Sequence, residues 1–323
     1  MNKKIKTIIV TGPTASGKTS LAVELARKFN GEIISADSRQ VYKGLDLGTG
    51  KDLVDYAAIG DKEAVKYHLI DNVDINEEYN LLRFCKDCAN AVHDIASRGK
   101  LPIICGGTPL YINAIIDGYK LPGAPPDAEE RKKLRAKSCD ELATILKEQY
   151  PETAKYFRDW LNVNRLARAI EKSAVSENKI KPIVDDLDYI MVAPFYHRKV
   201  LHKRVEKRLD ERLNEGMIEE VEGLHKNGAT WEWLDFLGLE YRYVSAYLQE
   251  KMTKQEMRDQ LLIKIRQFVK RQDIWFRKME REDKDIYWLP EEDLKKAISL
   301  IDLFLNDKKL PKIEIRIKDI KYH

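Results

Sequence analysis

The chain has 323 residues, of which 43% are hydrophobic and 34% are charged, and its formal net charge is +4. This length supports one large hydrophobic core with a second, smaller unit. No apolar run approaches the roughly 20 residues of a membrane-spanning helix, so we expect no membrane span. The short apolar run near the N-terminus continues directly into a glycine loop, which indicates a first strand rather than a secretory signal.

The cysteines are too few and too scattered for a disulfide framework. Cys85 and Cys88 form a C-x-x-C pair within a helical pattern, and neither Cys105 nor Cys139 completes a second pair. We therefore expect no zinc or redox site. A reducing, cytoplasmic setting is the simplest interpretation.

The N-terminal third alternates between strand and helix patterns. Apolar, β-branched runs predict strands, and amphipathic periodicity predicts helices between them. The predicted strands are 6–12, 31–37 and 101–107, and the predicted helices are 20–30 and 80–98. This alternation is typical of a parallel sheet covered by helices on both faces.

The segment between the first strand and the first helix, TGPTASGKTS, fills the G-x-x-x-x-G-K-[ST] template with Gly12, Gly17, Lys18 and Thr19. Such a loop presents backbone N–H groups to phosphate oxygens, and the next helix directs its positive end at them. Lys18 would add a positive charge, and the Thr19 hydroxyl would hold Mg²⁺. The third strand ends in CGGTPLY, without the aspartate that binds Mg²⁺ in many nucleotide hydrolases. The motif alone leaves open whether the ligand is a nucleotide or another diphosphate.

Three prolines and a glycine within 121–130 interrupt this rhythm, and short helices are predicted from there to about residue 180. Strand patterns return at 188–195 and 285–290, with long helices between them and a closing helix at 291–305. We predict an α/β fold, a P-loop-type parallel sheet flanked by helices, with an inserted all-helical subdomain. The α/β domain would comprise 1–120 and 186–306, the helical subdomain 121–185, and a basic mobile tail 307–323.

Two polar side chains are expected near the phosphate loop. Asp37 follows the second strand at the carboxyl edge, where open α/β sheets bind ligands. It could bind metal through water, act as a general base or simply cap a helix. Thr108, in GGTPLY, is either a helix N-cap or a hydrogen-bond donor in a site.

Positive charge is concentrated at 197–212 and 251–284, and the second segment interleaves an apolar stripe with cations such as Arg271. Arg165 and Arg168, in NRLARAIE, lie one turn apart on a predicted helix. Solvated helix faces explain each run taken alone. Two basic helices beside a phosphate loop favour a polyanionic partner.

Five motifs together resemble the tRNA dimethylallyltransferases over nearly the whole chain: GPTASGKT, ISADSRQVYKGLDLGTGK, GGTPLY, NRLARAIE and KRQDIWFR. All five in this order are highly specific. The resemblance implies transfer of a dimethylallyl group from dimethylallyl diphosphate to the exocyclic N6 amine of the adenosine immediately 3′ of the anticodon in tRNA, with release of diphosphate. It also implies that the loop holds the leaving diphosphate rather than ATP, with Mg²⁺ as cofactor.

The resemblance also implies roles for single residues. Asp37 matches the general base, Thr108 the threonine at the reacting amine, and Arg208 the arginine that clamps the diphosphate. The diphosphate cradle would comprise Gly12, Pro13, Thr14, Ala15, Ser16, Gly17, Lys18 and Thr19, with Thr19 also binding the metal. The tRNA contacts would come from Asp37, Ser38, Arg39, Gln40, Thr108, Asp127, Asn164, Arg165, Leu166, Ala167, Arg168 and Arg271.

The chain departs from the family pattern at 237–242. Many members carry Gly-Tyr-Arg or Gly-Tyr-Lys there, whereas this chain has Glu240 before Tyr241 and Arg242. Whether this segment contacts tRNA stays open. The zinc-finger extension of the eukaryotic members has no counterpart, which suggests a bacterial-type enzyme. We expect the tRNA anticodon stem-loop as partner, a monomer and a cytoplasmic location.

Three other functions share part of this pattern. A small-molecule kinase has the loop, the sheet and an inserted helical unit, but gives the GGT turn and the basic helices no purpose. A prenyltransferase acting on free adenine nucleotides would need no large basic surface. A tRNA-binding protein without activity leaves Asp37 and the phosphate loop unexplained.

Overall fold

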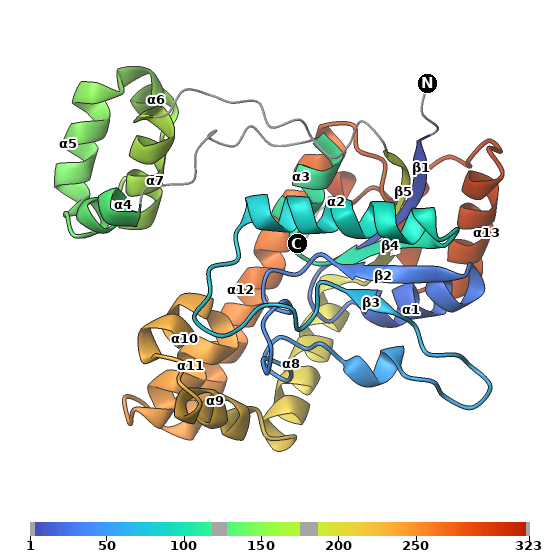
Figure 1. Ribbon diagram of the computed structural model, residues 1–323, viewed down its shortest axis with the longest axis horizontal. Helices are drawn as coiled ribbons and strands as arrows, with labels where there is room; N and C mark the ends of the chain where they lie inside the picture. Colours follow the sequence, from blue (N-terminus) through green and yellow to red (C-terminus); the bar gives the residue numbers. More distant parts are fainter. Residues whose placement is uncertain (1–3, 118–127, 175–186, 321–323) are drawn as a thin grey trace. The chain divides into compact units, whose positions relative to one another are not determined.

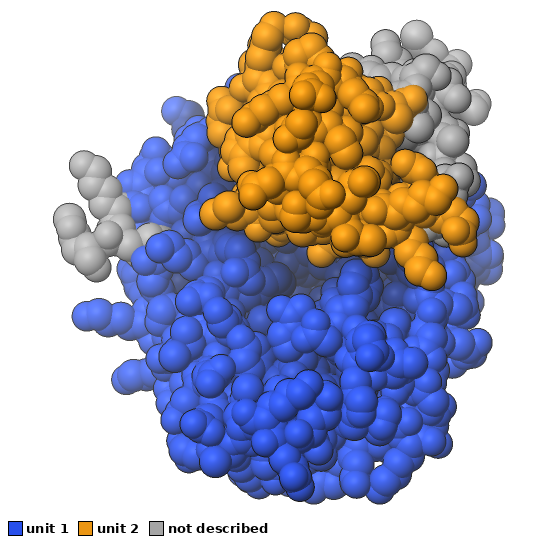
Figure 2. All heavy atoms as spheres, turned by 90° about the vertical axis from the view of Figure 1, so that its left-hand side faces the viewer, with its two compact units in different colours: residues 1–114, 183–323 blue, residues 115–182 orange. Residues whose placement is uncertain are grey.

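The computed structural model describes residues 4–117, 128–174 and 187–320 (Figure 1). The chain divides into two compact units, one formed by 1–114 with 183–323 and the other by 115–182 (Figure 2). Within the described ranges, no helix combines the length and the apolar character that a membrane span requires.

The first unit is built on a six-stranded parallel sheet of order β3-β2-β4-β1-β5-β6. Its central strand β1 contains Ile8, Ile9 and Val10, which are completely buried, as expected for a sheet covered on both faces. The predicted P-loop-type α/β fold is confirmed. The strands are β1 Ile5–Thr11, β2 Gly31–Ser35, β3 Tyr67–His68, β4 Leu101–Gly106, β5 Leu187–Phe195 and β6 Tyr287–Pro290.

Helices cover the two faces of this sheet. Helices α1 (Lys18–Lys28) and α13 (Leu294–Leu305) share one core with alternate residues of β1, among them Ile8 and Val10. Helix α2 (Leu81–Ser97) covers the other face (Figure 1), and α3 (Pro109–Asp117) follows β4. Strands β2, β3 and β4 lie on one side of β1 in the sheet, and the later strands β5 and β6 lie on its other side. The carboxyl end of β1 is therefore the switch point at which open α/β sheets bind ligands.

A helical layer follows β5 in the same unit. Helix α12 is 28 residues long and begins with a capping box formed by Thr253 and Glu256. It packs against α11 and α8 and so carries the basic motif KRQDIWFR alongside the sheet. The layer consists of α8 Arg198–Asn214, α9 Met217–Lys226, α10 Trp231–Leu237, α11 Leu239–Leu248 and α12 Lys254–Arg281.

The second unit contains only helices within its described part. Leu142, Leu146 and Leu166 are completely buried and form its core together with Leu134 and Ile170. This arrangement agrees with the all-helical insertion expected from the sequence. Its helices are α4 Ala128–Arg135, α5 Cys139–Gln149, α6 Pro151–Tyr156 and α7 Val163–Ala174.

Residues 307–320 differ from the mobile tail that their lysine-rich composition suggests. Ile317 is 2% exposed and lies in the short helix η3 (Ile317–Asp319). The carboxylate of Glu280, completely buried on α12, accepts hydrogen bonds from the backbone N–H groups of Ile317 and Lys318 and from Trp288 Nε1. A buried carboxylate requires hydrogen-bond donors, and these hydrogen bonds anchor residues 317–318 to α12.

Candidate active site

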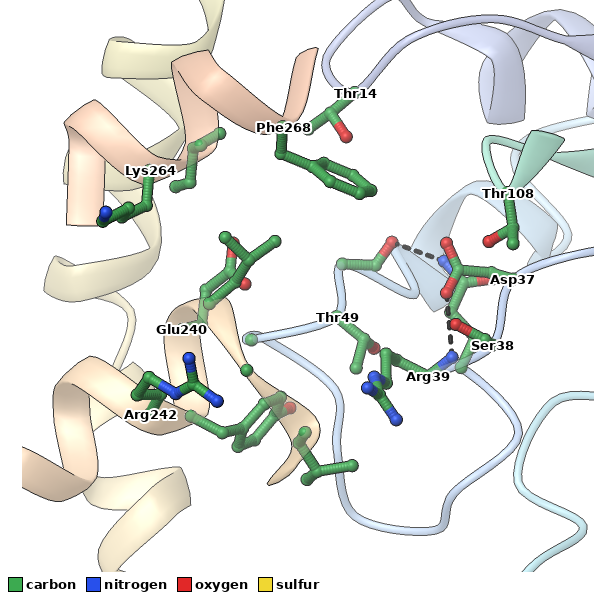
Figure 3. Close-up of a pocket in the computed structure, with 18 of the residues that line it drawn as sticks. Thr14, Asp37, Ser38, Arg39, Thr49, Thr108, Glu240, Arg242, Lys264 and Phe268 are labelled. Atoms are coloured by element: carbon green, nitrogen blue, oxygen red, sulfur yellow. Dashed lines mark hydrogen bonds between the residues drawn. The ribbon is translucent and has the colours of Figure 1, made fainter. Parts of the chain in front are cut away.

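A pocket of about 510 Å³ opens at the carboxyl edge of the sheet, and it is formed entirely by the first unit. Figure 3 shows Asp37, Ser38, Arg39 and Thr108 on one side and Glu240, Arg242 and Lys264 on the other. Residues far apart in the sequence therefore meet in one cavity. Of the residues that the sequence assigns to a site, those lining the pocket are Thr14, Lys18, Thr19, Asp37, Ser38, Arg39, Gln40, Thr108, Arg208 and Arg271.

The phosphate loop connects β1 to α1 at the floor of this region. Gly17 has φ +83°, a backbone conformation that favours glycine, and a Cβ there would lie 2.0 Å from the carboxyl group of Glu292. Ser16 Oγ is buried and has no hydrogen-bond partner within the described residues. Of the eight residues predicted to form the diphosphate cradle, Thr14, Lys18 and Thr19 line the pocket, whereas Gly12, Pro13, Ala15, Ser16 and Gly17 do not.

The cations around the loop indicate the charge of that ligand. Burial, followed by the nearby Arg208 guanidinium, lowers the pKa of Lys18. Burial, followed by Arg212, lowers the pKa of Arg208 in turn. Desolvation and mutual repulsion both disfavour the charged forms of these two groups. An anion with several oxygens would relieve both effects.

The carboxylate of Asp37 lines the pocket and is held by one backbone hydrogen bond. Its Oδ1 accepts a hydrogen bond of 2.9 Å from the backbone N–H of Arg39, and its other oxygen has no protein partner in the described part of the chain. Thr108 lies on the same side of the pocket (Figure 3), while its carbonyl accepts from the N–H groups of Tyr111 and Ile112 at the start of α3. Thr108 therefore begins a helix and also faces the cavity. Asp37 does not cap a helix, because no helix follows it directly.

Gln272 on α12 is a site residue that the sequence pattern hides. It falls on the apolar stripe of the helix and is 3% exposed. Its Oε1 accepts from the backbone N–H of Thr14 at 2.9 Å, and its Nε2 donates to the carbonyl of Gly107 at 2.6 Å. It thus ties the phosphate loop to the GGT turn. An amide on an otherwise apolar helix face is the signal that could have revealed it.

The loop at 46–52 lies largely within the motif ISADSRQVYKGLDLGTGK, but the contacts that fix it are not visible in the sequence. The carboxylate of Glu220 accepts hydrogen bonds from the backbone N–H groups of Asp46, Leu47 and Gly48. Lys51 is completely buried, donates 2.9 Å to the carbonyl of Tyr42 and pairs with Asp46 and Asp71. These long-range contacts fix the loop against the pocket.

Glu240 faces the pocket from α11, opposite Asp37 (Figure 3). Burial raises the pKa of its carboxyl, against the attraction of Arg212 and Arg208. Arg271 lines the pocket from α12 and lies over the ring of Phe268, with 5.7 Å from its Cζ to the ring centroid. Among the charged residues that line the pocket from the helical layer, Glu240 is the one carboxylate, and the others are Arg208, Arg212, Arg242, Lys264 and Arg271.

The remaining predicted tRNA contacts lie in the second unit. Asn164 and Arg165 are exposed on α7, and half-buried Arg168 pairs with Glu171 at 2.8 Å. The side chains of Leu166 and Ala167 are buried in the helical core, so they do not present the contacts expected of them. They follow the apolar face of α7. Asp127 lies outside the described residues.

A phosphate loop, a strand-end carboxylate and several cations around one pocket are typical of an α/β group-transfer enzyme. Residues 40–279 match the family model of IPP transferases, and residues 5–58 match that of isopentenyl transferases. The chain belongs to the IPP transferase family, a family of prenyl-transferring enzymes. The family and the enzyme class predicted from the sequence are confirmed.

Curated relatives support the same assignment. A tRNA dimethylallyltransferase of Geotalea uraniireducens is 42% identical over 87% of this chain and 91% of its own length. One of Treponema denticola is 44% identical over 90% of this chain and 97% of its own length. Both alignments span nearly the whole chain.

Solved structures show a similar fold. A tRNA isopentenylpyrophosphate transferase from Bacillus halodurans has a TM-score of 0.67 and 29% identity, covering 94% of this chain and 98% of the other. A eukaryotic dimethylallyltransferase acting on tRNA has a TM-score of 0.78 and 26% identity, covering 95% of this chain and 81% of the other.

Proposed function

We propose that the protein transfers a dimethylallyl group from dimethylallyl diphosphate to the N6 amine of the adenosine immediately 3′ of the anticodon in tRNA, releasing diphosphate. Its relatives are named for dimethylallyl transfer to tRNA. The observation that carries the proposal is the single pocket in which Asp37 and Thr108 lie with Lys18 and Arg208.

On the acceptor side, Asp37 is the general base. An adenine amine is a poor nucleophile because its lone pair is delocalised into the ring. The free carboxylate oxygen of Asp37 accepts the amine proton as the C–N bond forms, which contributes about 10²–10⁴-fold to the rate. The Thr108 hydroxyl orients the amine, and the hydrogen bond from Arg39 N keeps the carboxylate in place.

On the donor side, the loop amides, Lys18 and Arg208 bind the diphosphate and stabilise the charge that develops as it leaves. The Thr19 hydroxyl lines the pocket beside Lys18, so it would hold a magnesium ion that binds together with the diphosphate oxygens. Bound Mg²⁺ supplies further neutralisation of the leaving group.

The tRNA substrate has to deliver an unstacked base to this pocket. Anticodon loops are single-stranded, which keeps the cost of extruding a base to a few kcal/mol. We propose that Ser38, Arg39, Gln40 and Arg271 contact the loop nucleotides. The helical subdomain, through Asn164, Arg165 and Arg168, contacts the backbone. We further propose that the protein acts as a cytoplasmic monomer.

The first experiment incubates purified protein and Mg²⁺ with radiolabelled dimethylallyl diphosphate and, in parallel tubes, bulk unmodified tRNA, AMP or no acceptor. Label is expected in tRNA alone, on the adenosine 3′ of the anticodon after nuclease mapping. Label in AMP only would assign the protein to the free-nucleotide prenyltransferases. A parallel assay measures ATP consumption. Consumption of ATP without any prenyl transfer would instead indicate a kinase.

A further inference from the structure

Arg212 is a buried arginine whose charge the reaction described above does not use. It lies one turn after Arg208 on α8, lines the pocket and is 9% exposed. Its guanidinium makes one side-chain hydrogen bond within the described residues, 3.3 Å long, to Asp52 Oδ1. A guanidinium carries five N–H donors. Most of the donors of this buried group are therefore available to a ligand in the pocket.

The loop at 46–52 is shaped to hold Arg208 and Arg212 together. Gly50 has φ +63°, and a Cβ there would lie 1.7 Å from Arg212 Nη2 and 2.2 Å from Arg208 Nη2. A larger residue would displace both guanidinium groups from this position. Asp52, two residues on, pairs with both of them, with its Oδ2 2.9 Å from Arg208 Nη2. The two arginines thus pack against the same glycine and share one carboxylate. We call Gly50 and Asp52 together the arginine seat.

The seat is rigid. The carbonyl of Gly50 accepts hydrogen bonds from Gln40 Nε2 at 3.0 Å and from Arg208 Nη2 at 3.4 Å. The next residue, Lys51, is completely buried and pairs with Asp46 and Asp71. A loop anchored in this way holds two like charges side by side at a fixed position. Such an arrangement is stabilised when an anion with several oxygens bridges the pair.

We propose that Arg212 is a second arginine of the diphosphate clamp, which binds the diphosphate together with Arg208 on the seat formed by Gly50 and Asp52. This inference rests on the proposed function, because it takes the anionic ligand of the pocket to be a diphosphate. The planar fork of each guanidinium matches two phosphate oxygens, so the pair would contact both phosphates. Arg212 then contributes to donor binding and not to tRNA affinity.

The test measures binding of inorganic pyrophosphate with Mg²⁺, and of dimethylallyl diphosphate, by titration calorimetry. Arg212→Gln is expected to weaken both by about 10- to 100-fold, with tRNA affinity unchanged. Arg212→Lys should recover part of the loss, since it restores the charge but not the fork. The matched control is Lys207→Gln on the same helix, which removes the same charge from a side chain that is 78% exposed and pairs only with Glu211 in the described structure.

Gly50→Ala provides a second variant that leaves both arginines in the chain. Its methyl group displaces the guanidinium groups, so pyrophosphate binding should fall by about tenfold, and the additional loss should be smaller in the Arg212→Gln background. Equal binding by Arg212→Gln and Lys207→Gln would overturn the role of Arg212 while leaving the proposed function intact. Absence of pyrophosphate and dimethylallyl diphosphate binding in the unmodified protein would instead overturn the proposed function itself. Thermal unfolding of each variant separates lost folding from lost binding.

Discussion

The two sides of the pocket are built by different means. On the sheet side, Lys18, Asp37 and Thr108 each follow a buried parallel strand, so the hydrogen-bonded ladder sets their backbone positions. On the helical side, Arg208 and Glu240 are carried by helices far along the chain. Arg208 pairs with Asp52, on a loop that Glu220 anchors through its backbone N–H groups. The sheet side is suited to chemistry that tolerates little displacement. The helical side is suited to tuning charge.

The largest expected effect is on the sheet side. Asp37→Ala should lower single-turnover prenyl transfer by about 10²–10⁴-fold, because the amine proton loses its acceptor. Binding of tRNA, measured by filter retention, should change little. Asp37→Asn is the matched control for shape and should be almost as slow. Turnover close to that of the unmodified protein would exclude Asp37 as the base.

The next largest effect is expected at Gln272, which connects the helical side to the sheet side. Gln272→Leu leaves the N–H of Thr14 and the carbonyl of Gly107 without their partner, which costs about 1–3 kcal/mol of folding free energy. Because these atoms belong to the phosphate loop and the GGT turn, turnover should also fall, by roughly 10- to 100-fold. Denaturant unfolding and single-turnover assays measure the two effects.

The control for Gln272 is Gln255→Leu, on the same helix, where the side chain contacts only Asp259 at the surface of the described structure. If Gln272→Leu lowers stability but not turnover, the residue has a packing role alone. If neither changes, the connection between α12 and the phosphate loop contributes nothing measurable.

Local motifs made the sheet side predictable. The strand–loop–helix pattern and the order of five motifs were enough for the fold class, the family and a set of residues that the structure brings into one pocket. Short strand β3 was missed because its two residues carry no periodicity. Leu166 and Ala167 were assigned to tRNA because a motif match does not distinguish the buried from the exposed face of α7.

Residues of the helical side were harder to predict because their partners are distant in sequence. Gln272 contacts residues more than 150 positions away, and Arg212 lies against a loop 160 positions earlier. Propensity and spacing within one helix contain no information about such contacts. The same holds for 307–320, whose lysines suggest solvation while the buried Glu280 anchors it.

Cations outside the pocket should affect tRNA binding without affecting the donor. Arg168→Ala is expected to weaken tRNA binding by about three- to tenfold and to reduce the slope of log K against log salt by about one, as for a single phosphate contact. Glu171 keeps its pair with Arg131, so α7 should stay folded. Lys155→Ala, which removes an exposed lysine paired with Glu152, is the control. Equal salt slopes for Arg168→Ala and the unmodified protein would remove Arg168 from the interface.

The smallest effect concerns the carboxylate on the helical side. Burial raises the pKa of Glu240 above its ordinary value, so this group becomes neutral as the pH falls through that raised pKa and is charged above it. When charged, it attracts Arg208 and Arg212 but repels an anionic donor in the same pocket. Glu240→Gln should therefore bind pyrophosphate about threefold more tightly than the unmodified protein above that pKa, and the two affinities should converge below it.

Titrating both proteins side by side from about pH 4.5 to 8 removes the protonation of pyrophosphate from the comparison, because that term is common to both. The quantity compared is the pyrophosphate affinity of Glu240→Gln divided by that of the unmodified protein. If this ratio stays constant across the pH range, the protonation of Glu240 does not affect donor binding. If it falls below one at high pH, Glu240 instead holds the two arginines in their binding position. The helical side would then depend on its carboxylate for geometry, as the sheet side depends on its strands.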